Sequence, residues 1–182
     1  MGCTLFKQPW SGSGRGLMLV GQDLKPNNEA WLHRTLRTQG YVMAEPYYPR
    51  YQDLAAEFEC KRGRIHYAGL SMFHTTPIGV YAGNIVDTEA NKRRQLATMI
   101  DINLYDRVVE ALALLLEDLI PDGYNGPVGV DMMVLQDGRL HPCVEVNVRH
   151  TMGWVALTLT RRYPNKLPFH FDVMKGVKDF LS

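Results

Sequence analysis

The sequence predicts an α+β fold, in which antiparallel strands form hairpins and the helices lie apart from them. Two apolar runs at 128–135 and 140–148 are joined by a Gln-Asp-Gly segment at 136–138, which is typical of a hairpin turn. Between 100 and 119 the apolar side chains recur close to the helical period, which indicates an amphipathic helix. We therefore expect a mixed or antiparallel sheet with helices packed on it.

The remaining elements follow from apolar runs and from the residues that stop them. A loop rich in Gly and Ser at 9–16 separates two short strands near the N-terminus. Asn27 or Asn28 can cap the helix that follows, and Gly40 can end it. The expected strands are 5–7, 17–20, 41–45, 54–61, 65–73 and 78–86, and the expected helices are 27–39, one or two within 87–117, 154–163 and 171–181.

Composition excludes several classes of protein. The chain has 182 residues and a formal net charge of +1, which argues against a general binder of nucleic acid or membrane surfaces. The most apolar stretch, 100–120, is interrupted by charged side chains and reads as a packed helix. Cys3, Cys60 and Cys143 give no disulfide framework and no zinc spacing. Because no signal peptide is recognisable either, we expect reduced thiols and a cytoplasmic setting.

The segment WSGSGRG at 10–16 has the composition of a phosphate-binding loop. Its alternating glycines leave backbone N–H groups free to turn toward an anion. It lacks the Gly-Lys-Ser/Thr ending of a Walker loop, and a flexible surface loop is the alternative. Lys7, just upstream, can neutralise phosphate oxygens, although a lone lysine is more often a solvated charge.

Three oxygen-bearing side chains, Asp131, Glu145 and Asn147, interrupt two otherwise apolar strands. Burying a carboxylate without a partner is costly, and Mg²⁺ prefers such hard oxygen ligands. Glu145 and Asn147 are two residues apart, so both point to one face of their strand. The alternative is a structural network in which the carboxylates pair with Arg149, Arg139 or another base.

Asp131 joins this group only if the hairpin register allows it. Its separation from Glu145 is even, so both reach the same face only across a loop with an odd number of residues or across a bulge. A three-residue loop at 136–138, with Gly138 in the left-handed conformation, meets this condition, whereas a two-residue turn does not. Pro142 can add a bulge of its own and change the count.

The segment AEPYYPRYQD at 44–53 is an extended connector stiffened by prolines. Backbone at such a hinge can pair with an adenine edge, and Asp53 can accept hydrogen bonds from ribose hydroxyls. The alternative is a polar loop with exposed tyrosines.

These motifs, taken in order, resemble those of the ATP-grasp superfamily. The elements are Lys7, the SGSGRG loop, the EPYYPRYQD connector, the Asp131 strand and the EVNVR strand, and the segments KQPWSGSGRGL, GVDMMV and HPCVEVNVRHTMG look like a bacterial ATP-grasp branch of unassigned substrate. The resemblance implies an ATP-grasp-like fold with an incomplete small lobe. Residues 1–44 would form the partial small lobe with the phosphate-binding loop, and 45–182 the larger lobe with the adenine hinge and the metal site. The chain would then be the C-terminal part of a longer protein.

The resemblance also implies a role for each motif residue. Lys7 would contact the ATP phosphates and Arg149 the γ-phosphate or an acyl-phosphate oxyanion, so these two are the catalytic candidates. Asp131, Glu145 and Asn147 would bind one or two Mg²⁺ ions, for which Mn²⁺ could substitute. The other nucleotide-binding candidates are Ser11, Gly12, Ser13, Gly14, Arg15 and Gly16 in a lid over the phosphates, Glu45, Pro46 and Tyr47 beside the adenine, and Asp53 on the ribose.

The activity implied is that of an ATP-dependent carboxylate–amine or carboxylate–thiol ligase. Such enzymes transfer the γ-phosphoryl group to a carboxylate, mostly by positioning and charge neutralisation. This chain alone would lack the substrate domain and need not turn over. The partners expected are the nucleotide, a carboxylate substrate and a second copy of the chain through exposed apolar surface. The alternatives are a non-catalytic nucleotide-binding module and a structural or interaction domain that has lost ATP.

Overall fold

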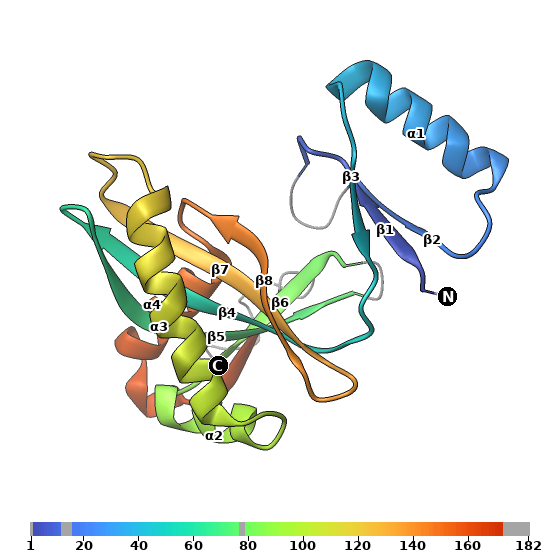
Figure 1. The fold of residues 1–182 in the computed structure, drawn as a ribbon. Coiled ribbons are helices and arrows are strands. Elements are labelled where there is room, and N and C mark those ends of the chain that lie inside the picture. The colour runs from blue at the N-terminus through green and yellow to red at the C-terminus, as the bar shows by residue number, and fades with distance from the viewer. Residues whose placement is uncertain (1, 12–15, 77–78, 173–182) are drawn as a thin grey trace. The chain divides into compact units, whose positions relative to one another are not determined.

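The computed structural model describes residues 2–11, 16–76 and 79–172, and it divides the chain into two compact units (Figure 1). Unit 1 comprises Met1–Pro49 and Thr75–Tyr81, and unit 2 comprises Arg50–His74 and Ala82–Ser182. The elements combine antiparallel strand pairs with separate helices, so the predicted α+β class is confirmed.

Unit 1 contains a three-stranded antiparallel sheet and one helix. The strands are β1 (Thr4–Lys7), β2 (Leu17–Val20) and β3 (Met43–Pro46), in the order β2-β1-β3. The helix α1 (Pro26–Gln39) ends at Gly40, whose φ of 83° a residue with a side chain would rarely adopt.

The start of α1 differs from the prediction. Lys25 is the N-cap residue, and the Asn28 side chain accepts a hydrogen bond from the Lys25 backbone N–H at 3.0 Å. Asn28 therefore contacts the N-cap residue from inside the first turn and is not itself the cap. Pro26 occupies the first helical position, where a missing N–H costs nothing.

Unit 2 is built on a six-stranded sheet with the strand order β8-β7-β4-β5-β6-β9. The pairs β8–β7, β7–β4, β4–β5 and β6–β9 are antiparallel. The turn between β4 and β5 has positive φ at Arg62 and Gly63. The strands are β4 (Arg50–Lys61), β5 (Arg64–Thr75), β6 (Tyr81–Val86), β7 (Gly126–Leu135), β8 (Leu140–Asn147) and β9 (Phe169–Asp172).

One face of this sheet packs against helices to form the core. Helix α3 (Ile102–Leu119) contributes Tyr105, Val109 and Leu116 to the same buried cluster as alternate residues of β4 and β7. Those strand residues are Leu54, Ala56, Phe58, Val128, Val130 and Met132. The sequence predicts one or two helices within 87–117, and the structure has two, α2 (Glu89–Ala97) and α3, which extends two residues beyond that range.

The first turn of helix α4 (Met152–Arg162) lies against the opposite face of the sheet. A Cβ built on Gly153 in the first turn of α4 would meet the Glu57 carboxyl, and the Leu157 side chain lies against Gly69 of β5. Because side chains alternate along a strand, Asp53 and Glu57 of β4 share this face.

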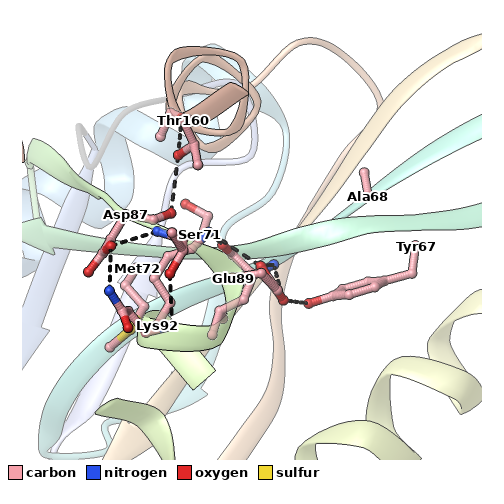
Figure 2. Close-up of polar contacts among 12 residues, drawn as sticks. Tyr67, Ala68, Ser71, Met72, Asp87, Glu89, Lys92 and Thr160 are labelled. Atoms are coloured by element: carbon pink, nitrogen blue, oxygen red, sulfur yellow. Dashed lines mark hydrogen bonds and ion pairs between the residues drawn. The ribbon is translucent and has the colours of Figure 1, made fainter. Parts of the chain in front are cut away.

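A polar network fastens α2 to β5 where that strand bulges (Figure 2). The pairing shifts so that Ala68 is the extra residue. The backbone N–H of Leu70 donates to the Glu89 carboxylate at 3.0 Å, and the buried ammonium of Lys92 donates to the Leu70 carbonyl. Tyr67 also donates to Glu89, at 2.8 Å. Side chains of α2 thus satisfy both backbone polar groups of Leu70.

The prediction of a helix at 171–181 is wrong for its first residues. Phe171 lies in β9, which pairs with β6 through Phe171 and Asn84. Its residues 173–181 lie outside the described part of the chain. Among the described residues, none of the helices combines the length and apolar character needed to cross a membrane.

Candidate metal and nucleotide site

The β7–β8 hairpin places the two candidate metal carboxylates opposite each other. Asp131 pairs with Glu145, and Gly129 pairs with Asn147. The three-residue loop at 136–138 is confirmed, because the Leu135 N–H donates to the Arg139 carbonyl at 2.8 Å across it. Gly138 has a φ of 79°, which is the left-handed conformation predicted for a three-residue loop.

An irregularity in β8 around Pro142 changes the register without changing the face. Met133 pairs with His141, but Asp131, two residues earlier, pairs with Glu145, four residues later. Two additional residues therefore enter β8 in this stretch. An even number of additional residues preserves the side-chain alternation, so Asp131 and Glu145 remain on one face.

Two hydrogen bonds in series connect Asp131 to Asn147 and Asn147 to Arg149. The Asn147 amide, 6% exposed, donates from Nδ2 to Asp131 Oδ2 at 3.1 Å. The Arg149 guanidinium donates from Nη2 to Asn147 Oδ1 at 2.7 Å. The three side chains form a continuous polar line across β7 and β8.

Burial and the nearby Glu145 carboxylate raise the pKa of Asp131 to about 6, while the Asn147 hydrogen bond and Arg149 act in the opposite direction. A divalent cation bound here would offset the unfavourable ionisation of Asp131. The donors also fit Mg²⁺ chemically, since all are hard oxygens.

The alternative is a structural network in which Asp131 and Glu145 pair with arginines, and the described residues do not form these salt bridges. Neither Asp131 nor Glu145 makes a salt bridge with an arginine in the part of the chain that the structure describes. Arg139 pairs with Asp137 at 2.7 Å in the hairpin turn. Within the same described ranges no three His, Cys, Asp or Glu side chains are placed to hold a metal ion, so the candidate set is two carboxylates and one amide oxygen.

Asp53, the predicted ribose ligand, lies on the same sheet face as Asp131. It pairs with Met133 across β4 and β7 and forms a salt bridge with Arg50 at 3.2 Å. Its charge contributes to the raised pKa of Asp131. Unit 2 therefore brings Asp53, Asp131, Glu145 and Asn147 to one face.

The candidate residues of unit 1 lie on its small sheet and in the loop between β1 and β2. Lys7 forms a salt bridge with Glu45 at 2.6 Å, between neighbouring strands β1 and β3. Pro46 is the last residue of β3, and the Tyr47 N–H donates to the Cys3 carbonyl at 2.8 Å.

The loop between β1 and β2 is described only at its two ends. The Ser11 hydroxyl donates to the Gln8 carbonyl at 2.9 Å, and the Gln8 N–H donates to the Gly16 carbonyl at 2.9 Å. The other predicted lid residues, Gly12, Ser13, Gly14 and Arg15, lie outside the described residues.

Sequence reasoning missed Glu57, a carboxyl of β4 that is 1% exposed on the same face. The Thr151 hydroxyl donates to Glu57 Oε1 at 2.8 Å. Burial, with a smaller effect from Asp131, raises the pKa of Glu57 to about 7, against the effect of the Thr151 hydrogen bond. The available signal was a charged residue at the centre of an apolar strand run.

No protein-family model matches the sequence, and no curated protein matches it either. Solved structures do match. The biotin carboxylase–β,γ-ATP complex from Campylobacter jejuni has a TM-score of 0.64 and 14% identity, and the match covers 87% of this chain and 34% of that one. The biotin carboxylase domain of the Hydrogenobacter thermophilus 2-oxoglutarate carboxylase, in complex with MgADP, ADP and bicarbonate, has a TM-score of 0.59 and 13% identity, over 87% of this chain and 36% of that one. The L-amino acid ligase from Bacillus licheniformis has a TM-score of 0.53 and 16% identity, over 92% and 39%.

These neighbours share one architecture, which this chain shares over most of its length. The chain has the ATP-grasp fold. It spans about a third of the length of these two biotin carboxylase chains.

Proposed function

We propose that the chain is the Mg-ATP-binding part of an ATP-dependent ligase that activates a carboxylate as an acyl-phosphate for attack by an amine or thiol. The observation behind the proposal is the pairing of Asp131 with Glu145, beside Asn147 and Arg149, on an ATP-grasp fold. The neighbours give further support, since one is in complex with MgADP and bicarbonate and another is an L-amino acid ligase.

Asp131, Glu145 and Asn147 would hold the cation, which supplies charge neutralisation to the phosphate oxygens when it is bound. Asn147 Oδ1 has two lone pairs, so it could ligate the cation while it accepts the hydrogen bond from Arg149 at 2.7 Å. The other N–H groups of the Arg149 guanidinium would donate to the γ-phosphate or to the acyl-phosphate oxyanion. The protein's contribution is positioning and electrostatics, so the proposal names no nucleophilic residue.

The other roles stay predictions. Lys7, Ser11 to Gly16, and Glu45 to Tyr47 keep the phosphate, lid and adenine roles that the resemblance implies, and Asp53 keeps the ribose. A second Mg²⁺ ion and substitution by Mn²⁺ belong to the same set. We also propose self-association through α3, where Leu114 and Leu119 are 69% and 71% exposed.

Calorimetric titration with ATP, with and without Mg²⁺, tests the proposal. We expect Mg²⁺-dependent binding by the starting chain and none by Glu145→Gln. Glu110→Gln is the matched control, because Glu110 is an exposed carboxylate on α3, which packs on the other sheet face. Equal binding by Glu145→Gln and Glu110→Gln would contradict the metal-site assignment.

A further inference from the structure

The buried carboxyl of Glu57 lies in a space that neighbouring glycines leave open. Its cross-strand partners are Gly69 on β5 and Gly129 on β7, and Gly153 of α4 lies above it. A Cβ on Gly129 would come within 2.9 Å of Glu57 Oε2, and a Cβ on Gly153 would clash with Glu57 Oε1. Burying a carboxyl here is costly, and two positions without side chains, Gly129 and Gly153, accommodate it, which suggests a task beyond packing.

That carboxyl is connected to the start of α4 through one hydroxyl. Thr151 is the N-cap residue of α4, and its Oγ1 accepts a hydrogen bond from the Trp154 N–H at 3.0 Å. The same hydroxyl donates to Glu57 Oε1 at 2.8 Å. Glu57 therefore fixes the first turn of α4 on the sheet, 94 residues away along the sequence.

The first turn of α4 follows directly on the residues of the candidate metal site. Only His150 separates Thr151 from Arg149, and Arg149 donates to Asn147, which donates to Asp131. Asn147 also lies opposite Gly129, on the other side of that glycine from Glu57. The chain between Asn147 and Thr151 is thus held at one end by the site and at the other end by Glu57.

We propose that Glu57 is a positioning residue, which acts through Thr151 to hold Arg149 against Asn147 and so to orient the Asn147 amide at the metal site. The inference deepens the proposed function and rests on it for its nucleotide-binding consequence. The contact itself exists without nucleotide and is testable without it. Oε2 of Glu57 accepts no hydrogen bond among the described residues, so the Thr151 hydroxyl is the polar contact of the carboxyl that reaches α4.

The test compares variants of Thr151 in the whole chain. Thr151→Val keeps the shape of the side chain and removes the hydroxyl, whereas Thr151→Ser keeps the hydroxyl. Because Thr151→Val also removes a helix cap, Thr88→Val is the matched control: Thr88 caps α2, accepting from the Asn91 N–H at 3.2 Å, and has no contact with the metal site.

The first readout is nuclear magnetic resonance of the nucleotide-free protein. We expect Thr151→Val to shift the Asn147 side-chain amide and the Arg149 guanidinium signals and to speed their exchange with water. Thr151→Ser and Thr88→Val should leave both signals in place. Unchanged signals in Thr151→Val would overturn the inference, whatever the chain does with ATP.

The second readout is Mg-ATP affinity by calorimetry. We expect Thr151→Val to weaken binding by ~10-fold to ~100-fold, the usual effect of removing a group that orients a metal ligand. Adding Thr151→Val to Arg149→Ala should cost nothing further, because Thr151 acts through Arg149. Full additivity of the two changes would refute the positioning route. If the starting chain binds no Mg-ATP while the resonance shifts occur, the proposed function fails and the positioning contact stands.

Discussion

Gly129 is the residue whose substitution most directly probes the packing beneath the candidate site. In Gly129→Ala the new Cβ would lie 2.7 Å from Thr151 Cγ2 and 2.9 Å from Glu57 Oε2. Neither neighbour can move easily, because Glu57 is 1% exposed and Thr151 is 9% exposed. Overpacking of this kind costs about 1–3 kcal/mol, which exceeds the ~0.5–1 kcal/mol that alanine gains over glycine in regular structure.

The assay is urea denaturation followed by circular dichroism, with stability read from the midpoint at constant slope. We expect Gly129→Ala to lower the free energy of unfolding by about 1–2 kcal/mol. Gly21→Ala is the control, because a Cβ there meets nothing within 4 Å. Thr151→Ser removes Cγ2 and keeps the hydroxyl, so it should recover part of the loss. A Gly129→Ala protein as stable as the starting chain would refute the argument.

Three further predictions concern charge and hydrogen bonding. Burial raises the pKa of Glu57 from 4.5 to about 7, so the folded state holds a proton that the unfolded state loses. Glu57 should therefore make stability fall by up to about 3 kcal/mol as pH rises from about 4.5 to 7. In pH-dependent denaturation, Glu57→Gln should remove this part of the slope and leave the part due to Asp131, whose pKa is also raised. Glu89→Ala should lower the free energy of unfolding by about 1–3 kcal/mol, because it leaves the Leu70 N–H without its acceptor and Lys92 without its ion pair; a midpoint equal to that of the starting chain would contradict this. Asn147→Ala should abolish Mg-ATP binding and leave the circular dichroism spectrum unchanged, and normal binding by this variant would remove Asn147 from the proposed ligands.

Local patterns in the sequence predicted the elements whose signals lie close together along the chain. The 136–138 loop and the helix end at Gly40 each carry a glycine, which tolerates positive φ, next to an apolar run. The same-face placement of Asp131 and Glu145 followed from counting residues across that loop. These inferences need only short-range geometry.

The features that sequence reasoning missed depend on long-range pairing. The role of Glu57 becomes visible only once Gly69, Gly129 and Gly153 are known to surround it. Its hydrogen bond to Thr151 joins residues 94 positions apart. Likewise, the strand at Phe171 forms by pairing with β6, and its four residues are too short a run to identify a strand from the sequence alone.

Paramagnetic relaxation by Mn²⁺ tests most directly whether Asp131 and Glu145 hold the nucleotide-bound cation. The measurement is line broadening of backbone amide signals when Mn²⁺ and ATP are added to the protein. We expect the strongest broadening at 129–133 of β7 and 144–149 around the end of β8, with none of it in Glu145→Gln. Broadening centred elsewhere, or unchanged in Glu145→Gln, would contradict the assignment of the metal site.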